Sequence, residues 1–420
     1  MSKLDELIKE LCPDGVEYKK IKDVYTRLRG TPITASKMKE IENPNGDIRI
    51  FAGGKNAINA FANDIPNLNV VDKPAVLVQS RGIIDFIYYE RPFTFKNEMW
   101  AYTNEDKVSV KFLYYVLKNN ALHFRELASG MGSLPQISLR VTEEFRVPVP
   151  PLEVQSEIVK ILDNFTELTA ELTAELTARK KQYEYYRNRL LTFDTASHIK
   201  KVKLGDVAKV TKLAGFEFTK YVTYAEKGHI IALRGLNVKN GNLDLCDVKY
   251  IDGSDLSKLE RSKLHVGDML FTYVGTIGQV ALIDKEDTYY LAPNVALIRA
   301  DKNVLLPEYM RFYFQSSLFW DTQIKRLLQS SSMKNIPMEK IRKFELLVPP
   351  IDVQRRLVHV LDNFDKVCND LHIGLPAEIE ARKKQYEFYR DSLLTFLEKG
   401  ESILTEQNRT EQNRTKVRPD

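Results

Sequence analysis

The histidines and cysteines are too scattered to build a catalytic or metal site. The six histidines occur singly and no HExxH motif is present, so we expect no zinc site. The three cysteines are odd in number and far apart, which predicts neither a disulfide framework nor a CxxC metal knuckle. We interpret them as buried or incidental thiols. These residues are His123, His198, His229, His265, His359, His372, Cys12, Cys246 and Cys368.

Nucleotide and methyl-donor motifs are also missing. The segment FAGGKNA (51–57) resembles a phosphate loop, but that loop would need Gly where Arg49 stands and Ser or Thr where Asn56 stands. The only Pro-Pro pairs, at 150–151 and 349–350, follow Val and not the Asn or Asp of an adenine-methyltransferase signature. No set of nucleophile, base and orienting residue can be assembled. The sequence therefore predicts a recognition protein without catalytic activity and without a cofactor or metal of its own.

The bulk composition fits a globular protein with more than one domain. The chain has 420 residues, of which 43% are hydrophobic, and a formal net charge of +5. The N-terminal segment is charged throughout and lacks the apolar run of a signal peptide. We expect no membrane association and a cytoplasmic location.

An internal duplication organises the chain. VPPLEVQSEIVKILDNF (149–165) is repeated as VPPIDVQRRLVHVLDNF (348–364), and RKKQYEYYRNRLLTF (179–193) is repeated as RKKQYEFYRDSLLTF (382–396). The offset is 199 residues for the first motif and 203 for the second, so the second copy carries four extra residues between its motifs. Like segments therefore alternate with two larger, unlike blocks.

This alternation predicts five regions. The two blocks carry net charges of +2 and +6, and the repeated segments carry −2 and −1. This alternation suits two basic blocks that contact a polyanion, separated by helical spacers that do not contact it. The short repeat TEQNRTEQNRT near the C-terminus has little apolar content and predicts a disordered tail. The regions are an N-terminal block (1–148), a central helical spacer (149–196), a second block (197–348), a C-terminal helix (349–398) and the tail (399–420).

Apolar residues recur at steps of three and four in both repeated segments, which predicts two helices of about 40 residues. Each helix can bury its apolar stripe against the other, and we expect an antiparallel coiled coil. Gly374 and Pro376 should kink or interrupt the second helix. The blocks contain short β-branched and aromatic runs followed by helical patterns. The expected fold class is α+β, with two mixed α/β domains separated by the two long helices.

The stretch LTAELTAELTA (168–178) repeats a four-residue unit. Leu168, Leu172 and Leu176 follow steps of four, whereas a heptad alternates three and four. An ordinary solvated amphipathic helix is one interpretation. We favour a spacer whose length changes by whole units, because near-identical tandem units arise and vary by slippage.

Two unlike blocks, each closed by VPPxxxQ, LDNF and RKKQYExYR, with TAEL units in the first helix, resemble the specificity subunit of type I restriction-modification systems. The TAEL repeat is similar to the IC subgroup. The resemblance implies two target recognition domains, each of which reads half of a split, asymmetric site in double-stranded DNA.

The resemblance also implies helices that dock two modification subunits. Those methyltransferase subunits would bind S-adenosylmethionine, and the restriction or motor subunits would use ATP and Mg²⁺. Two alternatives remain open: a two-domain DNA-binding regulator, and a coiled-coil scaffold without restriction-modification partners.

We expect the DNA contacts to come from glycine-containing segments of the two blocks. Glycines let the backbone approach a ligand, and amide, hydroxyl and cationic side chains suit phosphates or purine edges. The candidates are Lys55, Asn56, Gln79, Arg81, Ser133 and Gln136 in the first block, and Arg234, Tyr273, Thr276, Ser331, Lys334 and Asn335 in the second.

Overall fold

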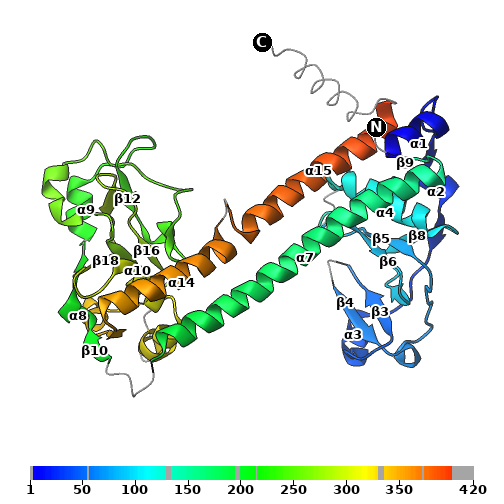
Figure 1. Cartoon of the computed structure of the whole chain (residues 1–420). Helices are drawn as coiled ribbons and strands as arrows, with labels where there is room; N and C mark the ends of the chain where they lie inside the picture. Colours follow the sequence, from blue (N-terminus) through cyan, green and yellow to red (C-terminus); the bar gives the residue numbers. More distant parts are fainter. Residues whose placement is uncertain are drawn as a thin grey trace, which may run out of the picture. The chain divides into compact units, whose positions relative to one another are not determined.

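The computed structural model divides by packing into two units (Figure 1). The N-terminal unit comprises Met1–Glu171 with Ile379–Asp420, and the C-terminal unit comprises Leu172–Glu378. Each unit therefore holds one of the two expected mixed α/β domains, for which we keep the name recognition domain that the sequence resemblance implies, together with parts of the repeated helices. The structure describes residues 3–53, 56–128, 134–193, 199–213, 215–329, 335–370 and 373–399. The predicted disordered tail lies outside the described residues, apart from Lys399.

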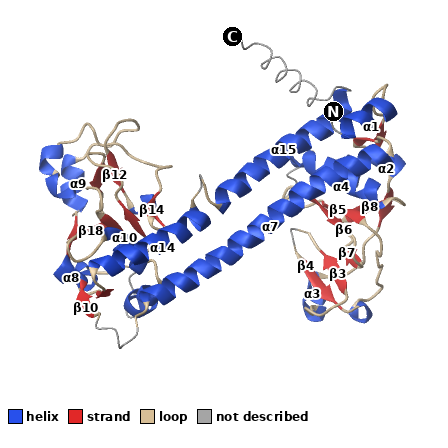
Figure 2. Cartoon of the chain, viewed as in Figure 1, coloured by secondary structure: helices blue, strands red, loops and turns tan. Residues whose placement is uncertain are grey.

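The recognition domain of the N-terminal unit is built on an antiparallel four-stranded sheet with the order β2-β8-β5-β6. A three-stranded sheet, β4-β3-β7, and the pair β1-β9 complete its strands (Figure 2). The elements are α1 (Lys3–Leu11), β1 (Tyr18–Lys20), α2 (Ile21–Val24), β2 (Thr26–Leu28), α3 (Ala35–Ile41), β3 (Ile48–Phe51), β4 (Ala57–Ala60), η1 (Ala62–Asp64), β5 (Ala75–Gln79), β6 (Asp85–Tyr89), β7 (Phe93–Phe95), β8 (Trp100–Thr103), α4 (Lys107–Asn119), α5 (Ala121–Glu126), α6 (Leu139–Glu143) and β9 (Arg146–Pro148).

The recognition domain of the C-terminal unit repeats this plan. Its four-stranded sheet has the order β11-β18-β15-β16, which matches β2-β8-β5-β6 strand for strand. The elements are β10 (Lys200–Lys203), α8 (Leu204–Val207), β11 (Ala208–Lys212), α9 (Gly215–Tyr221), β12 (Ile231–Leu233), η2 (Gly235–Asn237), β13 (Val238–Lys239), β14 (Asn242–Leu243), η3 (Leu256–Lys258), η4 (Glu260–Ser262), β15 (Met269–Thr272), β16 (Val280–Leu282), β17 (Tyr289–Leu291), β18 (Val295–Ala300), α10 (Pro307–Phe314), α11 (Ser317–Phe319), η5 (Trp320–Ile324), α12 (Lys325–Gln329), α13 (Met338–Arg342) and β19 (Glu345–Val348).

The first repeated segment is one continuous helix, α7 (Leu152–Leu191), of 40 residues. The second is interrupted, which confirms the break predicted at Gly374 and Pro376. It forms α14 (Ile351–Asn369) and α15 (Leu375–Lys399). A Cβ atom on Gly374 would lie 2.3 Å from the Lys366 carbonyl oxygen, so the turn requires glycine. Pro376 falls in the first turn of α15, where its missing N–H group costs no hydrogen bond.

The motifs of one repeat pack on the motifs of the other. In the N-terminal unit, Phe165 of the first LDNF motif stacks on Tyr389 of the second RKKQYExYR motif, with ring centroids 5.2 Å apart. In the C-terminal unit, Phe364 stacks on Tyr186 at 5.8 Å. Leu393 shares a core with Ile158, which lies on the N-terminal side of Phe165. The helices are therefore antiparallel within each unit, as expected for the coiled coil.

The glutamine of each VPPxxxQ motif joins its helix to the adjacent recognition domain. Gln155 is 3% exposed and accepts a hydrogen bond from the Ser109 hydroxyl at 2.9 Å. Gln354 is fully buried; it accepts a hydrogen bond from the Leu306 amide at 2.8 Å and donates to the Val304 carbonyl. In both repeats a buried amide therefore bonds polar groups of the recognition domain and a backbone carbonyl at the start of its own helix segment.

Within the described residues, no helix is long and apolar enough to cross a membrane. The same residues contain no cluster of His, Cys, Asp and Glu side chains that could hold a metal ion. Cys12 and Cys368 are buried and Cys246 is exposed, and all three are free thiols.

Candidate nucleic-acid interface

In the N-terminal unit, two distant loops are joined by a short backbone ladder. The Ile137 amide donates to the Ser80 carbonyl at 3.0 Å, and the Gly82 amide donates to the Pro135 carbonyl at 2.9 Å. Arg81 and Gln136 form the bridge between these bonds. Gly82 has φ of +79°, a conformation that glycine adopts without strain. Two of the predicted contact residues are thus held side by side at the end of β5.

The C-terminal unit builds the same ladder at the end of β15. The Ile336 amide donates to the Tyr273 carbonyl at 2.9 Å, and Val274 bridges Asn335. Gly275 has φ of +75°, like Gly82. Residues 80–82 (SRG) and 273–275 (YVG) are therefore structurally equivalent, and Val274 occupies the position of Arg81.

Arg81 and Asn56 line one open cavity of about 850 Å³ in the N-terminal unit. The Arg81 side chain is exposed and makes no hydrogen bond or ion pair with any described residue. Asn56 is exposed and donates to the Gly53 carbonyl at 3.4 Å. Lys96 and Glu98 also line this cavity and pair with each other at 2.7 Å. Arg81 is therefore a cation here that is available to a ligand.

Two predicted contacts have little access to a ligand, because one is buried and the other is paired inside the protein. The Gln79 side chain is 2% exposed, which leaves it little access to a ligand in this structure. Arg234 donates to the Asp247 carboxylate at 2.8 Å and to the Asp247 carbonyl at 2.9 Å, and it is 23% exposed. Arg234 precedes η2 and is not part of the β15 ladder. Contacts of Gln79 and Arg234 with DNA therefore stay predictions. The burial of Gln79 and the pairing of Arg234 with Asp247 do not favour them.

The remaining described candidates of the C-terminal unit surround the second ladder. Tyr273 is half-buried against the core, and burial raises the pKa of its hydroxyl. Thr276 is exposed, and its carbonyl accepts a hydrogen bond from the Thr272 hydroxyl at 2.5 Å. Asn335 is half-buried beside Val274. The predicted contacts Lys55, Ser133, Ser331 and Lys334 lie outside the described residues.

Sequence reasoning missed two apolar residues beside Arg81. Ile83 is 57% exposed and Leu134 is 48% exposed, and both line the cavity that holds Arg81 and Asn56. Their proximity depends on the ladder between 80–82 and 135–137, so no local sequence signal marks them as a pair. Together with Arg81 they combine a bidentate donor with apolar surface, the two kinds of group that read guanine edges and thymine methyl groups.

Comparison with known proteins defines the class. The family described as "Type I restriction modification DNA specificity domain" matches residues 13–179 and again 197–381. A type I restriction enzyme specificity subunit of Escherichia coli is 30% identical over 83% of this chain and 87% of its own length. A putative type I restriction enzyme specificity subunit of Haemophilus influenzae is 31% identical over 72% of this chain and 77% of its own length.

The fold agrees with this class. The S subunit of a type I restriction-modification system from M. genitalium superposes with a TM-score of 0.55 at 16% identity, and 91% of this chain and 96% of that chain are covered. The chain therefore belongs to the family of type I restriction-modification DNA specificity proteins. The prediction of a non-catalytic specificity subunit is confirmed by this membership.

Proposed function

We propose that each recognition domain contacts one half of a split, asymmetric DNA site, through the loops that the two ladders hold at the ends of β5 and β15. The observation that carries this proposal is the equivalence of these ladders combined with their different side chains. Arg81 and Gln136 stand in one unit where Val274 and Asn335 stand in the other. One scaffold that presents different chemistry in its two copies suits two half-sites of different sequence.

The same equivalence argues against a two-fold regulator. A homodimeric regulator presents identical side chains from both copies and reads a palindromic site. This single chain presents unlike side chains at matched backbone positions. A scaffold that binds no DNA would not need, on a fixed loop, an exposed arginine that the described residues leave unpaired.

We further propose that two modification subunits dock on the repeated helices, as in the family that the chain belongs to. In each unit a conserved antiparallel helix pair adjoins the recognition domain, which supplies two like surfaces for two like partners. S-adenosylmethionine would bind to those subunits, and ATP and Mg²⁺ to the motor subunits.

Methylation mapping tests the proposal. The chain is expressed with its modification subunit in a host without other methyltransferases, and methylated adenines are located by sequencing. We expect one asymmetric motif with two defined halves and an unread gap. A palindromic motif, or DNA binding by a homodimer of the chain without modification subunits, would support the regulator instead.

A further inference from the structure

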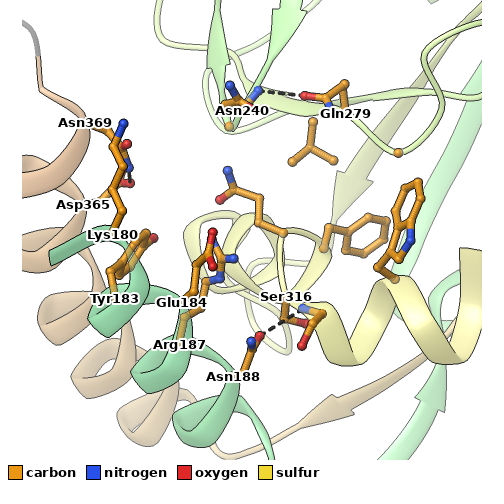
Figure 3. Close-up of a pocket in the computed structure, with 17 residues that line it drawn as sticks. Lys180, Tyr183, Glu184, Arg187, Asn188, Asn240, Gln279, Ser316, Asp365 and Asn369 are labelled. Atoms are coloured by element: carbon orange, nitrogen blue, oxygen red, sulfur yellow. Dashed lines mark hydrogen bonds between the residues drawn. The ribbon is translucent and has the colours of Figure 1, made fainter. Parts of the chain in front are cut away.

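The C-terminal unit contains a cavity of about 500 Å³ between its helix pair and its recognition domain (Figure 3). The helix α7 contributes Lys180, Tyr183 and Arg187, whereas the recognition domain contributes Gln279 and Trp320. This cavity is separate from the β15 ladder, although Gln279 closes the turn that begins at Tyr273. Nothing in the proposed DNA contacts uses it.

The lining is charge-balanced and rich in side-chain amides. Lys180 and Arg187 are offset by Glu184 and Asp365. A polyanion is bound by an excess of cations, which this cavity lacks. Asparagine and glutamine side chains both donate and accept hydrogen bonds, as the peptide backbone does. The amide residues are Asn188, Asn240, Gln279, Gln315 and Asn369.

Three lining residues are of the types that dominate protein interfaces, namely Trp, Tyr and Arg. The Trp320 ring is 39% exposed, and it lies so close to Gly278 that a Cβ atom there would come within 2.6 Å of it. Trp320 also begins the π-helical turn η5, a geometry frequent at functional sites. An exposed Trp held in a fixed position in this way suits a partner better than it suits solvent.

The Tyr183 hydroxyl is a second, independent sign of a ligand. Tyr183 is 4% exposed, and its hydroxyl has no hydrogen-bond partner of good geometry in the described part of the chain. The Arg187 guanidinium lies over the Tyr183 ring, 5.1 Å from its centroid, and its Nε atom is likewise buried without a partner. Buried polar groups are rarely left unpaired, so a rearrangement of these two side chains that lets a bound group pair with them would remove a cost.

The equivalent place in the N-terminal unit is occupied differently. Asp85 is the counterpart of Gln279. The ladders make Gln79, the last residue of β5, equivalent to Thr272, the last residue of β15; Gln79 pairs with Asp85, and Thr272 lies opposite Gln279. Lys118 donates to Asp85 at 2.6 Å, which ties α4 to the sheet there. The cavity beside this ion pair, of about 390 Å³, is lined by recognition-domain residues alone and by none from α7 or α15.

We infer that the cavity of the C-terminal unit receives a polypeptide segment of one modification subunit, and that the two modification subunits are therefore held differently. This inference rests on the docking that we propose above. The segment would pair its backbone with the amide side chains and pack against Trp320. At the counterpart of Gln279 in the N-terminal unit, the described cavity has no lining residue from α7 or α15, so this place offers its partner no receptor of the same kind.

Native mass spectrometry of the full chain with its modification subunit tests the inference. For wild type we expect two modification subunits for each chain. Trp320→Ala and Lys180→Glu should each weaken the binding of one of the two subunits by at least tenfold. At protein concentrations near the wild-type dissociation constant, a complex of one chain with one modification subunit should then dominate. Lys180 is exposed, so its substitution leaves the core intact.

The duplication supplies a matched control. Lys383 duplicates Lys180 in the N-terminal unit and is also exposed, and Lys383→Glu should keep both subunits. Phe216→Ala removes an exposed ring of the C-terminal unit outside the cavity and should also keep both.

Three results would overturn the inference. Unchanged two-to-one binding by both cavity variants would show that the cavity does not receive a partner. Loss of both subunits would remove the asymmetry, and loss of DNA binding with docking intact would assign the cavity to DNA. A wild-type chain that binds no modification subunit would instead refute the proposed docking itself.

Discussion

Phe165 lies flat against Tyr389, with an angle of 25° between the ring planes, and Phe364 meets Tyr186 at the same angle in the other unit. The LDNF motif of each repeat thus contacts the RKKQYExYR motif of the opposite repeat. An aspartate two residues before each of these phenylalanines binds a cation of the neighbouring domain: Asp163 pairs with Lys111 at 2.8 Å, and Asp362 pairs with Arg311 at 3.0 Å. One contact pattern, used twice, explains why both motifs are duplicated.

Arg81→Ala should impair recognition of one half-site and leave assembly with the modification subunits unchanged. A bidentate arginine–guanine contact contributes about 1–3 kcal/mol of discrimination, so the preference for the correct base should fall about 5- to 150-fold. Competition binding with single-base variants of the mapped site measures this. Arg91→Ala, an exposed arginine of the same domain, serves as the control. A uniform loss on all sequences would indicate a phosphate contact.

Insertion of one TAEL unit after Leu176 should keep both half-sites and lengthen the unread gap by one base pair. Four residues add about 400° and about 6 Å to α7, so the apolar stripe shifts by only about 40°. Leu168, Leu172 and Leu176 are all half-buried on α7, as one continuing stripe requires. A base pair adds about 3.4 Å and about 34–36°.

The insertion experiment compares the methylomes of parent and variant. An insertion of two residues is the control, because it adds about 200°, rotates the stripe away from its partner and should abolish methylation. An unchanged gap in the TAEL variant would refute the spacer interpretation.

Gln354→Ala should destabilise the C-terminal unit. The substitution leaves the Leu306 amide and the Val304 and Pro349 carbonyls without partners, and each unsatisfied buried group costs about 1–3 kcal/mol. Gln155→Ala should have the same effect in the N-terminal unit, where the Ser109 hydroxyl loses its acceptor. Urea denaturation of the variants measures the loss. Glu153→Ala, at an exposed site two residues before Gln155, should unfold like wild type.

The stabilisation of the fold by the Glu144 carboxylate should be lost at acid pH. Hydrogen bonds from Lys20 and Lys22 lower the pKa of the Glu144 carboxyl from 4.5 to about 2. A carboxyl whose pKa is lower in the folded state stabilises the fold above its unfolded pKa and loses this effect as the pH falls toward the folded pKa. The melting temperature of Glu144→Gln should therefore lie below that of wild type at pH 7, and the difference should shrink between pH 4.5 and 2.

Melting curves across this pH range provide the measurement for Glu144. Glu126→Gln removes an exposed carboxylate of the same domain and should show no such pH dependence. A constant difference between wild type and Glu144→Gln at every pH would contradict the assignment.

The helices were predictable because a duplicated apolar periodicity is a local signal. Pro376 marked the break between α14 and α15 correctly. The division of α7 between two units was not predictable, because the two copies of each motif are nearly identical and either pairing satisfies the same stripe. Only the packed structure shows that Phe165 meets Tyr389.

The recognition loops were only partly predictable for a related reason. Glycine at 82 and 275 signals a turn, and the structure has a positive φ at both. The burial of Gln79 and the pairing of Arg234 with Asp247 depend on residues far away in the fold. Residue type alone therefore predicted donors at these positions without showing that Gln79 is buried and that Arg234 is already paired.

The composition of the N-terminal unit has a consequence for synthesis on the ribosome. Leu393 and Leu394, among the last described residues, are buried in the same core as Leu4 and Ile8. The first unit to be translated therefore cannot complete its core until almost the entire chain has been made. Until then it exposes apolar surface on α7, which makes an interrupted or prematurely terminated chain prone to aggregation and degradation. Only a chain that extends through Leu394 can present a finished N-terminal recognition domain.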